Sequence, residues 1–311
     1  MRLVVVHNPK SSRHRQVERE VLARLPQPYA TYEVDTKLDV AANAAKLAKR
    51  LQASDRLISA GGDGTAAICL NAILQANLAI TTEFAILPYG NFNDLARTFG
   101  RPTLATLISK TPKTTKAYPL ELIVNSQHQR YALGYFTIGM FATATHIFDS
   151  TKIRQRLRHN HRNILYSILQ LAKWYFKHRR DEFFPPEFIL NGQKIINATD
   201  YVAVNAASMA GVMRSRPTIR SIQTFRSQTG NLSNLWGLLK IMLPSVLAKI
   251  PSQPTQSDTI EFATLTTLEI QGEGEYLTLH NVRQVQIQKS AQPLTIIVGQ
   301  NTKLRRTGEG K

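Results

Sequence analysis

Cysteine is almost absent from the sequence: Cys69 is the only one among 311 residues. A single thiol excludes an internal disulfide and indicates a reducing, cytoplasmic compartment. A secretory signal peptide is not expected either, because the apolar run in MRLVVVHNPKSS falls short of the roughly 7 to 15 residues that such a peptide needs. That run predicts a first buried strand.

Long apolar stretches that could cross a membrane are also missing. Residues 131–148 contain Gly, Thr and His throughout and are rich in aromatic and β-branched residues, which favours buried strands. Residues 232–250 are interrupted by Lys240 and Pro244, which makes a spanning helix improbable. We therefore expect a cytoplasmic protein that associates with membranes peripherally.

Acidic residues are scarce: 21 Asp and Glu face 39 Lys and Arg, for a formal net charge of +18. Such a chain gathers at polyanions. Between Lys152 and Arg180 there are nine Lys and Arg and no acid, with an apolar stripe at helical spacing. This segment is either a helix packed on the core or a surface for anionic lipid. Nucleic acid is disfavoured as a partner, because no nucleic-acid module accompanies the charge.

The order of the elements predicts two domains. Strand and helix patterns alternate over residues 1–115, which predicts an α/β domain with a parallel sheet. Residues 116–300 carry short alternating strands between turn signals, which predicts an antiparallel β-sandwich with a helical insertion at about 152–180. Residues 301–311 are expected to form a flexible tail.

Polar segments follow three of the predicted parallel strands: HNPKSS, GGDGT and PYGNFND. Ligands bind at the carboxyl ends of such strands. Glycines before a helix let backbone N–H groups approach a phosphate, and Thr65 offers it a hydroxyl. Asp63 and Asp94 are candidate Mg²⁺ ligands, since this ion takes one or two carboxylates with water and phosphate oxygens. The alternative is that each acid only caps a helix.

These motifs resemble the diacylglycerol kinase catalytic-domain family, in its bacterial soluble lipid-kinase branch. The matching residues are Asn8, Pro9, the whole of GGDGT at 61–65, Pro88, Gly90, Asn93, Asp94, Ala96, Arg97 and Gly100. The resemblance implies a nucleotide-binding α/β domain, akin to those of NAD kinases and phosphofructokinases, followed by a β-sandwich that binds lipid. It also implies an ATP-dependent phosphotransferase of phospholipid metabolism, which transfers the γ-phosphoryl group to diacylglycerol or a related lipid.

The resemblance also assigns roles to residues. It places Glu273 as the proton acceptor from the lipid hydroxyl, with Asp63 as the second catalytic residue. Mg²⁺ would be held by Asp63 and Asp94. The residues expected to contact ATP are Asn8, Thr36, Gly61, Gly62, Asp63, Gly64, Thr65, Gly90 and Asn91. For Glu273 the alternative is an exposed acid in the turn QGEGE.

The chain departs from the family pattern at several positions where the family has small or acidic residues. These are Phe92, Pro119, Gln271 and the segment QTGNLSNLW at 228–236. The departures leave open a catalytically weak relative that binds nucleotide or lipid. An enzyme similar to NAD kinase is a further alternative, because NAD kinases share the GGDG turn. Whether the chain forms a homodimer also stays open.

Overall fold

The computed structural model describes residues 1–90, 93–139, 142, 173, 176, 187–196, 198–209, 213–214, 222–228, 253–273 and 275–299. Asn91, Phe92 and the tail lie outside the described residues. So do the insertion at 152–180, apart from Lys173 and Phe176, and all of 228–236 except Gln228.

The first sheet has six strands in the order β2-β1-β3-β4-β18-β5. Its strands are β1 (Arg2–His7), β2 (Tyr29–Glu33), β3 (Asp55–Gly61), β4 (Glu83–Pro88), β5 (Thr114–Ala117) and β18 (Leu294–Ile297). All neighbours are parallel except β5, which runs antiparallel to β18. The predicted parallel α/β sheet is confirmed.

Helices cover both faces of this sheet. They are α1 (His14–Val17), the π-helix η1 (Glu18–Leu22), α2 (Val40–Ala48), α3 (Asp63–Gln75), α4 (Asp94–Phe99) and α5 (Leu104–Ile108). One apolar core joins the sheet to α2, α3 and α4, and another joins it to α1, η1 and α5. Among the described residues, no helix is both long and apolar enough to cross a bilayer.

Strand β18 corrects the sequence interpretation, which assigned residues 294–297 to the second domain. It lies between β4 and β5 in the first sheet. Its side chains explain the position, because Leu294 and Ile296 enter the core beneath α3, whereas Ile297 enters the opposite core. A strand that is buried on both faces suits the middle of a parallel sheet.

The second sheet is antiparallel, as predicted. Its main path is β15-β14-β11-β8-β16-β17-β6-β7, and the hairpin β9–β10 attaches to it through β9. The strands are β6 (Leu120–Val124), β7 (Gln127–Ala132), β8 (Tyr135–Gly139), β9 (Glu187–Leu190), β10 (Gln193–Ile196), β11 (Ala198–Val204), β14 (Ile222–Gln228), β15 (Gln253–Thr255), β16 (Ser257–Gly272) and β17 (Glu275–Lys289). A separate pair consists of β12 (Ser208–Met209) and β13 (Met213–Arg214).

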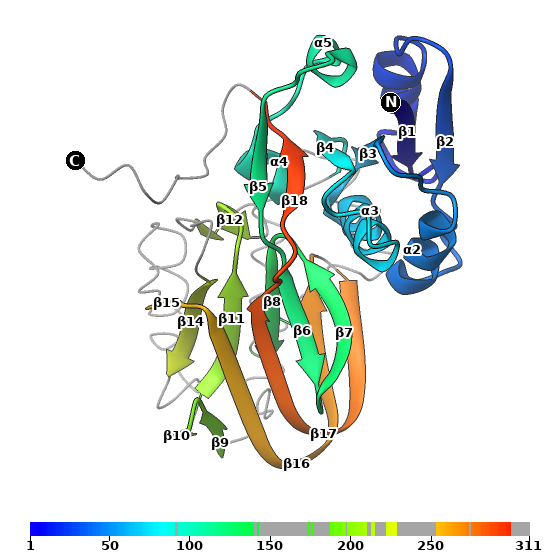
Figure 1. Ribbon diagram of the computed structural model, residues 1–311. Coiled ribbons are helices and arrows are strands. Elements are labelled where there is room, and N and C mark those ends of the chain that lie inside the picture. The colour runs from blue at the N-terminus through cyan, green and yellow to red at the C-terminus, as the bar shows by residue number, and fades with distance from the viewer. Residues whose placement is uncertain are drawn as a thin grey trace, which may run out of the picture.

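The chain crosses between the two sheets twice among the described residues, after β5 and after β17. Figure 1 shows the first sheet and its helices above the second sheet, with β5 and β18 leading down to it. The two crossings are bonded together, since the Ser290 N–H donates to the Pro119 carbonyl at 2.8 Å. The ammonium of Lys289 donates to the Tyr118 carbonyl at 3.3 Å.

Candidate active site

The glycine turn joins the end of β3 to the start of α3. Gly62 precedes the helix in an extended conformation, and Asp63 is its first residue. Thr65 is buried and folds back onto the turn, so that a Cβ added at Gly61 would lie 2.3 Å from its Oγ1. Glycine at position 61 is therefore required by the packing of Thr65.

The two glycine motifs touch each other through their backbones. A Cβ added at Gly90 would lie 2.3 Å from the Cα of Gly62. The Tyr89 N–H donates to the Gly61 carbonyl at 2.9 Å. Asn93 closes the second turn: its Oδ1 accepts the Gly90 N–H and its Nδ2 donates to the Gly90 carbonyl, both at 2.7 Å. The two glycine motifs thus lie in direct contact.

Asp63 caps a helix, but not the one on which it lies. Its carboxylate accepts the N–H groups of Asp94 at 3.1 Å and Leu95 at 3.2 Å, which are the first two residues of α4. Burial, together with the nearby charge of Asp94, raises the pKa of Asp63 to about 6. Asp63 therefore ties the two motifs together and keeps a carboxyl group beside the glycine turn.

Asp94 is buried beside Asp63 and is engaged by protein groups. Its Oδ1 accepts hydrogen bonds from Ser208 Oγ on β12 and from Arg97 at 3.4 Å. The described residues hold no group of three or more His, Cys, Asp or Glu placed for a metal. Mg²⁺ nevertheless typically binds one or two carboxylates together with water and phosphate oxygens. Asp63 and Asp94 lie next to each other and could provide the two carboxylates.

Glu273 lies in the turn between β16 and β17, in the left-handed conformation at φ 54°. It is 4% exposed, so the exposed turn acid considered from the sequence is wrong. Its Oε1 accepts the N–H groups of Leu133 at 2.7 Å and Gly134 at 2.6 Å. Its Oε2 is buried and has no hydrogen-bond partner in the described part of the chain.

The surroundings of Glu273 favour its protonated form. The pKa of Glu273 is raised to about 8, mainly by burial and also by the charge of Asp63, whereas the two backbone N–H groups and Arg130 act to lower it. Electrostatic coupling between Glu273 and Asp63 places the predicted proton acceptor near the glycine turn. A carboxyl that titrates near neutral pH, with one oxygen unpaired, can accept a proton from a bound hydroxyl.

Two further residues at this site were not singled out from the sequence. Glu275, at the start of β17, brings its Oε1 to 3.1 Å from where a Cβ on Gly64 would stand. Tyr135 is buried and receives a hydrogen bond from Gln271 at 3.4 Å. Gln271 stands where the family has an acid. Its Oε1 accepts a hydrogen bond from Thr137 Oγ1 at 3.0 Å, so the buried amide is hydrogen-bonded through both of its polar atoms. The sequence signal that could have identified Glu275 is the second acid of QGEGE, two positions after Glu273.

The other predicted nucleotide contacts are not joined to the glycine turn by a hydrogen bond in the described part of the chain. Asn8 follows β1, and its Oδ1 accepts the Lys10 N–H at 2.9 Å. Thr36 is exposed in the loop after β2. Their roles toward ATP stay predictions, as does that of Asn91.

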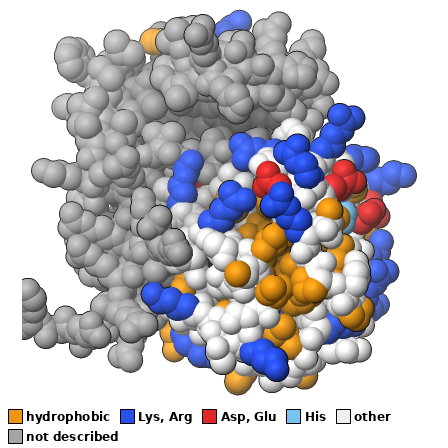
Figure 2. Space-filling view, turned by 90° about the horizontal axis from the view of Figure 1, so that it is seen from above, with side chains coloured by type: hydrophobic (Ala, Val, Ile, Leu, Met, Phe, Trp, Pro, Cys, Tyr) orange, Lys and Arg blue, Asp and Glu red, His pale blue; other side chains and the backbone are white. Residues whose placement is uncertain are grey.

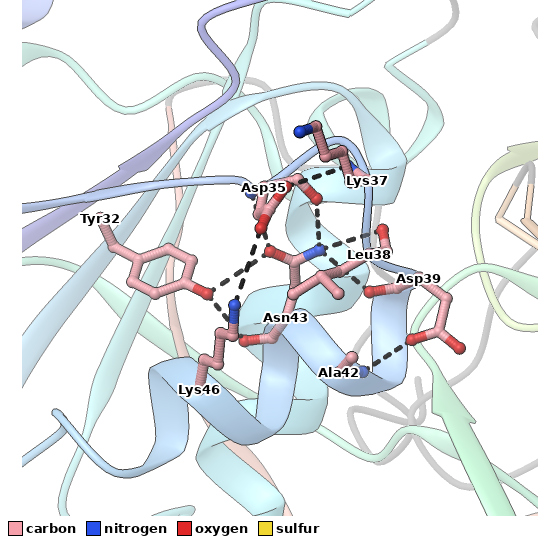
Figure 3. Close-up of polar contacts among 8 residues, drawn as sticks. All are labelled: Tyr32, Asp35, Lys37, Leu38, Asp39, Ala42, Asn43 and Lys46. Atoms are coloured by element: carbon pink, nitrogen blue, oxygen red, sulfur yellow. Dashed lines mark hydrogen bonds and ion pairs between the residues drawn. The ribbon is translucent and has the colours of Figure 1, made fainter.

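The loop that carries Thr36 has a fixed shape, which Figure 3 shows. The buried Asn43 of α2 donates to the carbonyls of Asp35 at 2.9 Å and Asp39 at 3.0 Å. Its Oδ1 accepts the Asp35 N–H at 3.0 Å. Asp39 in turn caps α2 through the Ala42 N–H at 2.7 Å. The side-chain amide of Asn43 therefore fixes the conformation of the backbone between β2 and α2.

Comparison with known proteins agrees with this geometry. The sequence model of the diacylglycerol kinase catalytic domain matches residues 2–135, which contain both glycine motifs. Residues 2–135 are therefore similar in sequence to the diacylglycerol kinase catalytic domain. The match ends at the first residue of β8, so the segment that holds Glu273 lies beyond it.

Solved structures resemble the chain over nearly its whole length. A diacylglycerol kinase of Bacillus anthracis strain Sterne has 19% sequence identity and a TM-score of 0.65, with 96% of this chain and 97% of that chain covered. Two provisionally assigned diacylglycerol kinases of the same strain have 20% identity and TM-scores of 0.62 and 0.64, with the same coverage. These likenesses show the fold, including the part of the chain that follows residues 2–135.

Proposed function

We propose that the protein is an ATP-dependent lipid kinase that transfers the γ-phosphoryl group to a hydroxyl of diacylglycerol or a related lipid. The observation that carries the proposal is the unpaired Oε2 of Glu273, which is coupled to Asp63 beside the glycine turn. The match to the diacylglycerol kinase catalytic domain supports phosphoryl transfer as the reaction class.

In this mechanism the backbone at the start of α3 holds the phosphates of ATP. Glu273 Oε2 accepts the proton of the lipid hydroxyl while the hydroxyl oxygen bonds to the γ-phosphorus. The bond between the γ-phosphorus and the β–γ bridging oxygen breaks, and ADP is released. Leu133 and Gly134 hold the other carboxyl oxygen and so orient the acceptor. Mg²⁺, held by Asp63 and Asp94, would neutralise charge on the phosphates when bound.

Radiolabel transfer from ATP to a panel of lipid micelles tests this reaction. The panel contains diacylglycerol, monoacylglycerol, a sphingoid base and phosphatidylglycerol, and free NAD serves as a non-lipid acceptor. We expect transfer to at least one lipid and strong loss with Asp63→Asn. Absence of transfer to every lipid, with wild type and Asp63→Asn indistinguishable, would contradict the proposal. Transfer to NAD alone would favour the NAD kinase alternative.

We also propose that the protein binds anionic membrane surfaces peripherally. The net charge of +18 supports this, and Figure 2 shows Lys and Arg side chains around a group of apolar side chains on the described part of one face. Each Lys or Arg near an anionic surface contributes about 1 kcal/mol.

Sedimentation with vesicles of phosphatidylcholine, with and without phosphatidylglycerol, tests this association. Binding should need the anionic lipid and weaken as salt is added. Equal binding to both kinds of vesicle would contradict the electrostatic proposal.

A further inference from the structure

Arg130 on β7 is a buried cation that interacts electrostatically with Glu275, the residue that lies over Gly64 of the glycine turn. Arg130 is 8% exposed. The strand that carries it is fastened to α3, because the Tyr131 N–H donates to Asn71 Oδ1 at 3.0 Å and Asn71 Nδ2 donates to the Tyr131 carbonyl at 3.1 Å. The strand that carries Arg130 is thus fastened to α3, the helix that follows the glycine turn.

The guanidinium of Arg130 has no hydrogen-bond or ion-pair partner in the described part of the chain. Three acids act on it electrostatically from longer range: Glu275, Asp39 and Glu273. Burial lowers the pKa of Arg130, and these acids oppose that effect. They also locate the side chain, since Glu275 lies over Gly64, Asp39 begins α2, and Glu273 is the proposed proton acceptor.

An unpaired buried charge is costly, and proteins rarely keep one without a use. Here a second positive element lies close by, because the first turn of α3 presents backbone N–H groups without helical acceptors. α3 has 13 residues, and its N-cap is Gly62, which has no side chain to bond these N–H groups. The missing partner of Arg130 is therefore expected to be an anion bound at this end of α3.

We propose that Arg130 binds a phosphate group held between the N-terminus of α3 and the start of β17. The inference rests on the proposed kinase function and names a further binding residue for it. A guanidinium suits this task because its planar set of donors matches two phosphate oxygens at once. The phosphate belongs either to the nucleotide or to an anionic lipid acceptor, and separate binding measurements distinguish the two sources.

The test compares Arg130→Met with Arg283→Met in the full chain. Arg283 is exposed on β17 and serves as the control for the loss of one positive charge. Calorimetric titration with ATP and with adenosine measures nucleotide binding. Sedimentation with phosphatidylcholine vesicles, with and without phosphatidic acid, measures binding to a lipid phosphate. Urea unfolding without ligand measures stability.

We expect Arg130→Met to weaken the binding of ATP, or of the phosphatidic acid vesicles, by about tenfold, with adenosine unchanged. A loss for ATP assigns the phosphate to the nucleotide, and a loss for the vesicles assigns it to the acceptor. The unfolding free energy should stay equal or rise, because an unpaired buried charge is removed. Arg283→Met should leave ATP and adenosine binding unchanged.

Unchanged binding of both phosphate ligands would overturn the proposal, as would lower stability together with an equal loss for adenosine. If Arg130→Met does not fold, Arg130→Lys takes its place, with a smaller expected loss because lysine lacks the planar set of donors. These measurements need no turnover. A chain that transfers phosphate to no lipid would refute the proposed function and still give a clear result for Arg130.

Discussion

At the scale of single residues, the proposed role of Glu273 as proton acceptor can be tested by a single substitution. Replacing Glu273 with Gln keeps an oxygen for the N–H groups of Leu133 and Gly134 but removes the proton acceptor. We predict that Glu273→Gln lowers kcat by about 100- to 10,000-fold and leaves ATP affinity close to that of the wild type. Initial rates and calorimetric titration check this. Turnover near the wild-type rate would contradict the assigned role.

The raised pKa of Glu273 gives the enzyme a pH dependence. The acceptor must be ionised, so kcat should rise with pH until about 8 and then level off. Stability should change in the opposite direction, because between about pH 4.3 and pH 8 the folded state keeps a proton that the unfolded state has lost. The contribution of Glu273 to stability is full below this window and is lost as pH rises through it.

The same linkage predicts the stability of Glu273→Gln. Glutamine has no charge to bury, so above pH 8 the variant should be more stable than the wild type by a few kcal/mol at most. Urea unfolding of both proteins at several pH values checks the sign. A stability difference that does not change between pH 5 and pH 9 would contradict the perturbed pKa.

At the scale of elements, the turn between β4 and α4 is fixed by one side chain. Asn93 lies in the left-handed region at φ 54° and makes two hydrogen bonds to Gly90. We predict that Asn93→Ala lowers the unfolding free energy by about 1–2 kcal/mol and also weakens ATP binding, because Gly90 packs on Gly62.

Asn125 offers a matched control for this prediction. It is also left-handed, at φ 48°, and donates to the Asn281 carbonyl at 2.9 Å, in a turn of the second sheet away from the glycine motifs. Asn125→Ala should cost similar stability and leave ATP binding unchanged. If both variants bind ATP like the wild type, the turn does not shape the nucleotide site.

At the scale of the whole molecule, the two crossings between the sheets meet at Lys289. Its ammonium donates to the Tyr118 carbonyl of one crossing and also to Asn205. Burial lowers the pKa of Lys289 to about 7. Between about pH 7 and pH 10.4 the unfolded state holds the proton more tightly, so the Lys289 contribution to stability grows as pH rises through this window.

We predict that Lys289→Met flattens this rise, because methionine does not titrate. The difference in unfolding free energy between the variant and the wild type should change by a few kcal/mol across the window, as measured by urea unfolding. Lys116→Met, at an exposed lysine on β5 bonded to Thr295, is the control. Parallel stability curves for wild type and Lys289→Met would contradict the prediction.

Local sequence patterns determined much of the fold and part of the site. Alternating strand and helix patterns predicted the parallel sheet, since periodicity depends on which side of each element is buried. The glycines at 61–64 predicted an open helix start. The same patterns misplaced residues 294–297, because a short apolar run looks alike in either sheet. The role of Asp63 as a cap of α4 was also beyond local patterns, since its partners lie 31 and 32 positions away.

The sequence by itself determined which groups this protein has for phosphate chemistry: an open glycine turn, two neighbouring acids and a glutamate in a family-like strand. The tertiary structure alone decided what those groups can do. It buried Glu273 against N–H groups 139 and 140 positions away, and it left the Arg130 guanidinium without a hydrogen-bond or ion-pair partner among the residues that the structure describes. Burial and charge pairing arise when distant segments meet, so they set the pKa values and the binding capacity only in the folded chain.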